Sequence, residues 1–171
     1  EGFDNPTGTD LDISGGRTFV SDAKNNRVLI FNGSREASFV LGQDEFYKRA
    51  ADTLGSDKGL NLENSLTHVN GVAYDASKEV LYIADTGNNR IMVYDLSGTI
   101  SNGMVASGVI GQSGFSQVAA NRGGAVGNNT LSQPSGLSID PVNHKLYVAD
   151  TGNNRVLKYD LGSSVPLTAE D

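Results

Sequence analysis

One block of sequence occurs three times in this chain of 171 residues and limits what the chain can fold into. Each copy joins two short apolar runs through an Asp and a following Asn-Asn-Arg triplet, and the aspartates recur at intervals of 63 and 65 residues. The copies run from Phe19 to Phe31, from Leu81 to Tyr94 and from Leu146 to Tyr159. Such self-similarity predicts a repeat architecture, in which each unit buries its apolar face against its neighbours.

Each repeat has the pattern of short antiparallel strands joined by polar turns. A Pro-x-Gly-like segment, the lead-in, opens it and ends at Gly8, Gly71 or Gly136. The first two repeats also contain a run that ends in Gly-Gln, with a Phe three residues after the Gln. Four antiparallel strands with Asn, Gly and Asp turns are typical of a β-propeller blade. In the middle repeat these strands are expected at residues 71–75, 81–84, 91–94 and 107–112.

The third copy carries a family resemblance. Its Leu-Tyr-Val-Ala-Asp-Thr-Gly-Asn-Asn-Arg-Val block at 146–156, preceded by Pro-x-Gly-Leu-x-x-Asp at 134–140, resembles the NHL repeat of β-propellers. The Val-Leu-Gly-Gln-x-x-Phe segment at 40–46 resembles a long-period bacterial variety of that repeat. The resemblance implies an all-β fold of three four-stranded antiparallel NHL-type blades. Because closed propellers need about four to eight blades, it also implies an incomplete propeller.

The repeats predict a division of the chain into blades and connecting loops. Residues 163–171 contain Pro166 and make a poor fourth strand, so the third blade is expected to be incomplete. A single helical turn is expected at 45–51, and the Gly- and Asn-rich stretch 121–129 is expected to be flexible. The predicted units are blade 1 at 1–43, a loop at 44–63, blade 2 at 64–112, a loop at 113–130, blade 3 at 131–162 and a tail at 163–171.

The blade count leaves three explanations open. The chain is a fragment of a longer protein, or two copies join head to tail as a six-bladed ring, or copies stack without closure into a fibre. The chain begins at Glu1 and not at Met, which is expected where an upstream segment has been removed.

Composition excludes several classes of function. The chain has 20 acidic and 13 basic residues, a net charge of −7, and no basic run, so nucleic acid is not an expected partner. It has no cysteine, which excludes disulfides, thiolate chemistry and cysteine-ligated zinc. No apolar run approaches the roughly 20 residues that a membrane-spanning helix needs.

The triplicated polar residues are predicted to be scaffold. An aspartate at a tight turn can accept backbone N–H bonds across it, and an arginine can pair with a carboxylate or with carbonyls of its own or a neighbouring blade. Asparagine tolerates left-handed backbone geometry, which is expected to explain the Asn-Asn pair together with Gly87 and Gly152. The residues assigned this structural role are Asp22, Arg27, Asp85, Arg90, Asp150 and Arg155.

Residues that break the repeat are better candidates for binding. The lead-in varies at two polar positions, three residues and one residue before its glycine. In the NHL fold this connection lies near the central channel, where propellers commonly bind ligands. A capped, solvated turn is the competing interpretation. The candidate ligand-binding residues are Asn5, His68, Asn70, Gln133 and Ser135.

No catalytic residue, metal site or cofactor is predicted. His68 and His144 are the two histidines of the chain and are expected on opposite faces of the blades. Enzymatic NHL propellers of the amidating-lyase type use several histidine ligands around a metal, and this chain cannot supply them. A Gly-x-Ser-x-Gly elbow and a Gly-rich phosphate loop are also absent from the sequence.

These patterns predict a non-enzymatic binding or structural module. The expected partners are protein or glycan, further blades of the same protein, or other copies of the chain in a closed ring or a fibre. The expected location is extracellular or at the cell surface. The alternative function is that of a propeller hydrolase or lyase with a polar channel site.

Overall fold

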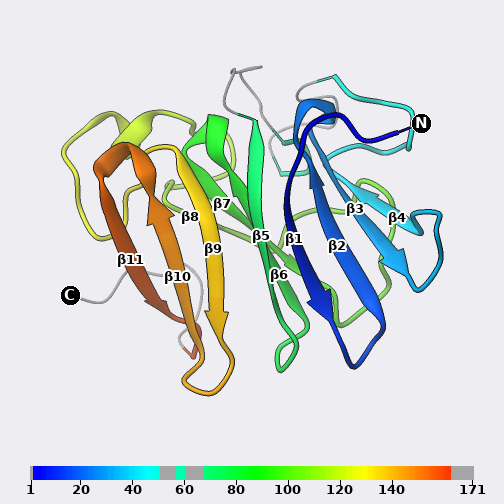
Figure 1. Cartoon of the computed structure of the whole chain (residues 1–171). Coiled ribbons are helices and arrows are strands. Elements are labelled where there is room, and N and C mark those ends of the chain that lie inside the picture. Colours follow the sequence, from blue (N-terminus) through cyan, green and yellow to red (C-terminus); the bar gives the residue numbers. More distant parts are fainter. Residues whose placement is uncertain (1, 51–56, 61–67, 163–171) are drawn as a thin grey trace.

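The computed structural model describes residues 2–50, 57–60 and 68–162. These residues form three antiparallel sheets that stand side by side as successive blades (Figure 1). Blade 1 contains β1 (Pro6–Asp12), β2 (Arg17–Asp22), β3 (Arg27–Asn32) and β4 (Phe39–Leu41). Blade 2 contains β5 (Val69–Asp75), β6 (Val80–Asp85), β7 (Arg90–Asp95) and β8 (Gly108–Ile110). Blade 3 contains β9 (Pro134–Asp140), β10 (Lys145–Asp150) and β11 (Arg155–Asp160).

The predicted all-β blade architecture is confirmed. In blades 1 and 2 the four strands pair in chain order, whereas the described part of blade 3 has three strands in the order β9, β10, β11. Residues 163–171, the tail of the sequence analysis, lie outside the described residues. The exact blade and loop boundaries stay predictions.

Blade 2 is the centre of the hydrophobic core because both of its faces are covered. Side chains of a strand point alternately to the two faces of its sheet. Leu81 and Ile83 therefore pack toward blade 1, while Tyr82 and Ala84 pack toward blade 3. The inner strands run alongside one another, with β5 in contact with both β1 and β9 (Figure 1).

Short 3-10 helices shape the connections. One follows the second strand of every blade: η1 (Ala23–Asn25), η2 (Thr86–Asn88) and η4 (Thr151–Asn153). A fourth, η3 (Ala120–Gly123), lies in the stretch that was expected to be flexible, and Arg122 there donates to the carbonyls of Gly111 and Gln112. The helical turn expected at 45–51 is reduced in its described part to one bond, from Lys48 N–H to the Glu45 carbonyl at 3.2 Å. Ala51 lies outside the described residues.

The described ranges contain no helix that is long and apolar enough to cross a membrane.

Candidate functional site

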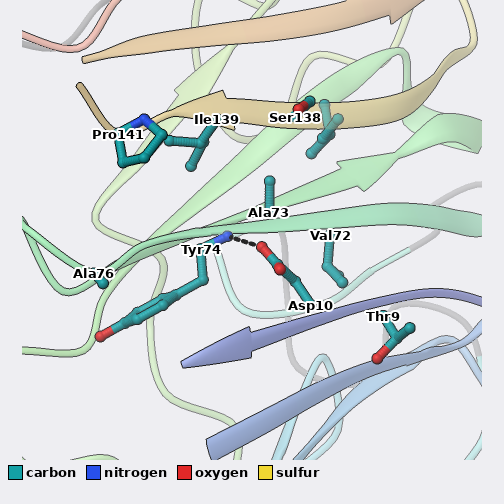
Figure 2. Close-up of a pocket in the computed structure, with 10 residues that line it drawn as sticks. Thr9, Asp10, Val72, Ala73, Tyr74, Ala76, Ser138, Ile139 and Pro141 are labelled. Atoms are coloured by element: carbon teal, nitrogen blue, oxygen red, sulfur yellow. Dashed lines mark hydrogen bonds between the residues drawn. The ribbon is translucent and has the colours of Figure 1, made fainter. Parts of the chain in front are cut away.

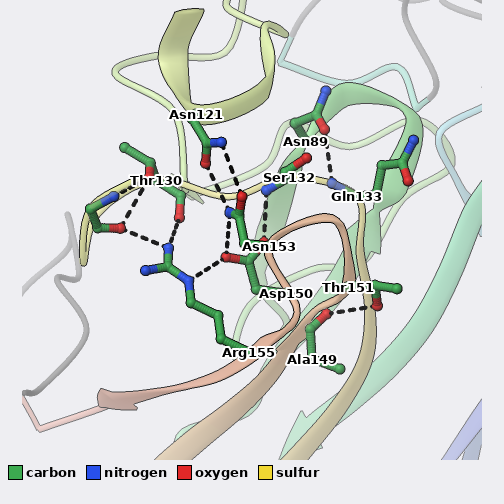
Figure 3. A network of polar contacts seen from close by, with 11 residues as sticks. Asn89, Asn121, Thr130, Ser132, Gln133, Ala149, Asp150, Thr151, Asn153 and Arg155 are labelled. Atoms are coloured by element: carbon green, nitrogen blue, oxygen red, sulfur yellow. Dashed lines mark hydrogen bonds and ion pairs between the residues drawn. The ribbon is translucent and has the colours of Figure 1, made fainter. Parts of the chain in front are cut away.

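The triplicated block forms the same polar lock in each blade. The aspartate that ends the second strand accepts a 2.7 Å bond from Nε of the arginine five residues later, in all three copies. The same carboxylate oxygen accepts a 2.8 Å bond from the first asparagine of the Asn-Asn pair. Its other oxygen accepts the backbone N–H of a residue 18 positions earlier, Asp4 in blade 1 and Ser132 in blade 3. Figure 3 shows this lock in blade 3, where it ties the lead-in to the turn.

In blades 1 and 2 the arginine also holds the loop that follows the fourth strand. Nη1 of Arg27 donates to the Phe46 carbonyl, and Nη1 of Arg90 donates to the Phe115 carbonyl. Nη2 of Arg90 donates to the Gly59 carbonyl at 3.1 Å. The guanidinium groups of both arginines are buried, with exposed fractions of 2% and 0%, and a buried cation is tolerated only when it is paired and hydrogen-bonded.

The Gln of the Gly-Gln pair completes the lock. Nε2 of Gln43 donates to the carbonyls of Asn26 and Ala50, and Nε2 of Gln112 donates to those of Asn88, Asn89 and Ala119. The Val-Leu-Gly-Gln-x-x-Phe segment is therefore both a strand and a clamp on the turn. Sequence reasoning identified the strand and missed the clamp, because the acceptors are backbone carbonyls that leave no signal in the sequence.

The expectation for the turn glycines was wrong. The left-handed residue of each turn is the second asparagine, with φ of 50° at Asn26, 54° at Asn89 and 53° at Asn154. Gly87 and Gly152 lie inside 3-10 helices instead. A Cβ at Gly152 would lie 2.8 Å from the Ser132 carbonyl oxygen, so this glycine permits a close approach of two backbone segments.

The predicted ligand-binding residues lie where one blade meets the next. The backbone N–H of Gln133 donates to Asn89 Oδ1 at 2.8 Å, and His68 Nδ1 lies 3.3 Å from Asn26 Oδ1. The second asparagine of the turn thus contacts the lead-in of the following blade in blades 1 and 2. Asn5 and Gln133 share a left-handed backbone, with φ of 56° and 47°.

The second variable position also lies close to neighbouring polar groups. Ser135 Oγ lies 2.6 Å from Thr151 Oγ1, and the Asn70 carbonyl accepts a bond from Thr7 Oγ1 at 3.3 Å. His68, Asn70 and Gln133 therefore take part in contacts between blades, whereas the Ser135 hydroxyl contact lies within blade 3, and the predicted role of these residues in ligand binding stays a prediction. His144 lies in the turn after β9, at the other end of the blades from the lead-ins, with Nδ1 3.5 Å from Ser77 Oγ.

A groove of about 310 Å³ runs along the inner strands β1, β5 and β9 (Figure 2). Its acidic side chain, Asp10, accepts the Tyr74 backbone N–H at 2.7 Å and so holds β1 against β5. Sequence reasoning missed this groove. Asp10, Ala73 and Ser138 occupy the same position of the three repeats and differ in chemical type, and this variation was the signal in the sequence. The groove is lined by Thr9, Asp10, Val72, Ala73, Tyr74, Ala76, Leu137, Ser138, Ile139 and Pro141.

Burial and hydrogen bonding shift the pKa values of two side chains in the blades. Burial by itself would raise the pKa of Asp12, but hydrogen bonds from the Gly15 N–H, Arg17 and Ser14 outweigh it and lower that pKa. Burial, and then the charge of Asp75, raises the pKa of Tyr82 to about 12. Among the residues that the structure describes, no group of three or more His, Cys, Asp or Glu side chains is placed to hold a metal ion.

The two end blades each expose a face that blade 2 buries. Val156 of blade 3 is 68% exposed, whereas Ile91, its equivalent in blade 2, is fully buried. Leu11 of blade 1 is 56% exposed, whereas its equivalent Tyr74 is 7% exposed. These two surfaces are called the outer face of blade 3 and the outer face of blade 1.

Comparison with known proteins agrees with this architecture. Residues 131–159 match the family model described as NHL repeat. The chain contains an NHL repeat. Blades 1 and 2 keep the same Asp to Asn-Asn-Arg spacing and the same lock, so all three are NHL-type blades.

Two of three relatives carry the same repeat in their names. NHL repeat-containing protein 2 of Bos taurus is 30% identical over 170 residues, which cover 94% of this chain and 21% of that protein. The Gallus gallus protein of the same name is 28% identical over 170 residues, with coverage of 96% and 22%. Protein SUPPRESSOR OF QUENCHING 1, chloroplastic, of Arabidopsis thaliana is 25% identical over 152 residues, with coverage of 88% and 13%. The chain thus spans about a fifth or less of the length of these relatives.

Solved structures support the fold alone. A chain of Kuenenia stuttgartiensis hydrazine synthase has a TM-score of 0.57 at 14% identity, over 95% of this chain and 34% of that one. A chain of a nidogen–laminin complex has a TM-score of 0.56 at 18% identity, over 99% of this chain and 49% of that one.

Proposed function

We propose that the NHL-type blades form a non-enzymatic module for protein interaction and structural assembly, in which the outer faces of blades 1 and 3 bind further blades. Those blades come from a second copy of this chain, in a closed ring or a fibre, or from further repeats of the same protein. Support comes from the interfaces within the chain, because each outer face repeats a surface that is buried between blades 1 and 2 or between blades 2 and 3.

One observation carries the proposal: the lead-in glycines of successive blades are stacked, and the last of them is uncovered. A Cβ at Gly71 would meet the Ser135 carbonyl of blade 3 and lie 3.0 Å from Leu137 N. At Gly136 the nearest atom to such a Cβ is Ala149 Cβ of the same blade, at an ordinary 3.7 Å. Gly136 therefore has the room to receive the backbone of another inner strand, as Gly71 does.

The lead-in contacts weigh against the hydrolase or lyase alternative. The Asn89 amide and the Gln133 N–H are engaged in joining blades 2 and 3, and Asp10 of the groove is engaged by the Tyr74 N–H. These contacts give the three groups a structural role and supply no base beside a nucleophile or a water.

We further propose an extracellular or cell-surface protein of the long-period bacterial variety, with protein or glycan as additional ligands. The net charge of −7 and the Asn-, Gly- and Ser-rich loops support that location, and the clamp made by the Gly-Gln-x-x-Phe segment supports the long-period assignment. Surface labelling of the source cells tests the location, and labelled protein confined to the cytoplasm would contradict it.

Sedimentation velocity tests the assembly. The wild-type chain is expected to sediment as species larger than its 18.0 kDa mass, in proportions that rise with concentration. Gly136→Ala and Val156→Asp place a methyl group or a charge in the proposed interface, so both are expected to sediment at 18.0 kDa with wild-type strand content. Val142→Asp is the matched control, because Val142 is 82% exposed in the turn after β9, and it should associate like the wild type. A wild-type chain that remains at 18.0 kDa at every accessible concentration would contradict self-assembly.

A further inference from the structure

The first strand of each blade ends in an aspartate, and one of the three has a buried oxygen without a partner. Asp12 Oδ2 accepts Arg17 Nε at 2.7 Å, and Asp140 Oδ2 accepts Asn143 Nδ2 at 2.7 Å. Asp75 is fully buried, and its Oδ2 has no hydrogen-bond partner among the residues that the structure describes. Because a buried carboxylate is costly unless it is paired, this oxygen marks a place for a donor or a cation.

The junction of blades 1 and 2 shows what the equivalent place holds there. Asp12 pairs with Arg17 across β1 and β2. The guanidinium carbon of Arg17 lies 5.1 Å from the centre of the Tyr74 ring and 6.0 Å from the centre of the Phe19 ring. Its Nη2 also donates to the Tyr74 hydroxyl. The cation is thus held between a carboxylate and two aromatic rings, where ion pairing and cation–π attraction act together.

The junction of blades 2 and 3 keeps the carboxylate and one aromatic ring but has a different residue in place of the cation. Asp75 pairs across β5 and β6 with Val80, which occupies the repeat position of Arg17. The ring on the second strand is Tyr82, and the facing residue of the next blade is Ile139 in place of a tyrosine. Val80 and Ile139 are only partly buried. Both are smaller than the side chains that they replace, so the carboxylate has lost its cation and the walls have retreated.

Two further observations concern the surroundings of the Asp75 carboxylate. The groove of the inner strands extends to this junction, because Ala73, Ala76 and Ile139 are among its lining residues (Figure 2). Successive side chains of a strand alternate between faces, so Asp75 points to the same side of β5 as Ala73, which packs toward blade 3. The charge of Asp75 also contributes, after burial, to raising the pKa of Tyr82 to about 12. The carboxylate therefore acts on the ring that lines the junction.

We infer that the junction of blades 2 and 3 is a binding site for a guanidinium cation, which takes beside Asp75 the place that Arg17 takes beside Asp12. An N–H of the cation donates to Asp75 Oδ2, and its planar face lies against the Tyr82 ring. A guanidinium suits this place better than an ammonium, because it is more weakly hydrated and stacks on aromatic rings.

The ligand is a small molecule that carries a guanidinium group or the arginine side chain of a peptide, since both present the same chemistry. Val80 and Ile139 are aliphatic and partly exposed, so rotation of these side chains opens a path to the carboxylate from the groove side. The site lies within one chain, between two of its own blades. The inference is therefore independent of the proposed association of the outer faces.

The test titrates the full chain with methylguanidinium, up to tens of millimolar at constant ionic strength, and follows the backbone amides by NMR. N-methylurea is the matched neutral probe, because it has nearly the same shape and no charge. Since His144 Nδ1 lies 3.5 Å from Ser77 Oγ at this end of the blades, the titration is run at about pH 8, where histidine is neutral. Saturable shifts at the ends of β5 and β9 and the start of β6 are expected with methylguanidinium and not with N-methylurea.

A blocked Gly-Arg-Gly peptide separates the two sources of the ligand. Binding of the peptide as well as methylguanidinium indicates an arginine side chain, and binding of methylguanidinium alone indicates a small molecule.

Variants test the carboxylate and the vacant place separately. Asp75→Asn removes the charge and is expected to weaken binding at least about tenfold, as loss of a hydrogen bond to a charged group does. Asp140→Asn is the matched control, because both oxygens of Asp140 are bonded within its own turn, and it should bind like the wild type. Val80→Arg supplies the guanidinium from the chain itself, so it is expected to abolish binding and to raise the urea midpoint of unfolding. Val80→Met adds bulk without charge and should raise that midpoint less.

Three binding results would overturn the inference: no shifts in the folded wild-type chain, equal shifts with N-methylurea, or equal affinity in Asp75→Asn. The first would mean that Asp75 Oδ2 holds a buried water. A urea midpoint of Val80→Arg no higher than that of Val80→Met would also contradict it. Circular dichroism of each variant confirms folding, and sedimentation of the same samples reports self-association separately, so failure of this site and failure of the stacked faces are distinguishable.

Discussion

Blades 2 and 3 share the sequence Ala-Asp-Thr-Gly-Asn-Asn-Arg at 84–90 and 149–155, yet the same residues lie in different environments. Arg90 is fully buried and donates to the Phe115 carbonyl in the loop after its blade. Arg155 is 22% exposed, and among the described residues the carbonyls that it bonds lie in the loop before its blade. Ile91 is buried and Val156 is 68% exposed. In a repeat protein the local fold is set within each unit, but burial and therefore energy come from the neighbours.

The largest contrast is expected for removal of the two arginines. Arg90→Ala leaves the Asp85 carboxylate buried without its cation and is expected to lower the free energy of unfolding by about 3–5 kcal/mol. Arg155→Ala also removes the cation from a buried carboxylate, Asp150, but the Arg155 side chain is 22% exposed, so water can reach the vacated position and the expected cost is about 1–3 kcal/mol. Urea unfolding of both variants measures the difference. Equal losses would show that blade 3 is as enclosed as blade 2.

The lead-in glycines give a second contrast. Gly71→Ala forces a methyl group against the Ser135 carbonyl and is expected to lower the free energy of unfolding by about 2–3 kcal/mol. Gly136→Ala meets only the Ala149 methyl group at 3.7 Å and, in dilute solution, is expected to change it by no more than about 0.5 kcal/mol. Thermal unfolding at low protein concentration checks both values. A large loss for Gly136→Ala there would mean that blade 3 is already covered.

The second asparagines provide a smaller contrast with an internal control. Asn89→Ala and Asn154→Ala place Ala at nearly the same left-handed φ, 54° and 53°, so the backbone cost is shared. The Asn89 amide additionally accepts the Gln133 N–H and donates to the Val118 carbonyl. We therefore expect Asn89→Ala to be about 1–2 kcal/mol more destabilising than Asn154→Ala in chemical unfolding. Indistinguishable variants would remove the inter-blade role of this amide.

The smallest effect concerns pH and the blade 2–blade 3 interface. The pKa of Tyr82 is raised from 10.0 to about 12, so the buried neutral phenol contributes stability that is fully present below pH 10 and is lost as the pH rises toward about 12. Tyr82→Phe is expected to flatten the stability profile within this window. Phe19 occupies the equivalent buried position of blade 1, which indicates that Phe fits there. Unfolding at several alkaline pH values measures the profile, and an unchanged slope in Tyr82→Phe would contradict the assignment.

The sequence allowed the blade architecture to be predicted because its signals are local. Alternating strands, a constant Asp to Asn-Asn-Arg spacing and turn residues recur in each unit, and the predicted use of Asp and Arg within a blade matches the contacts of Asp85 and Arg90. The contacts that close the lock could not be predicted. Arg90 reaches a carbonyl 25 residues away, and any residue there presents the same carbonyl. Gly152 was misassigned because a glycine required by close packing is identical in sequence to one required by a left-handed turn.

The candidate site was predicted less well than the fold. Variation at Asn5, His68 and Gln133 was interpreted as a channel ring, whereas the described contacts of His68 and Gln133 are with the turn of the preceding blade. The groove beside Asp10 and the exposure of Arg155 depend on which blades stand next to each other, and that information is not local to any segment.

Hydrogen exchange of two backbone amides tests the central claim most directly. Ile91 and Val156 occupy the same position of blades 2 and 3, and both point their N–H away from the middle of the sheet. In dilute, unassociated protein we expect slow exchange at Ile91, which β8 covers, and exchange at Val156 close to that of an unprotected amide. Equal protection of the two amides would contradict the account, because it would mean that the edge of blade 3 is already paired.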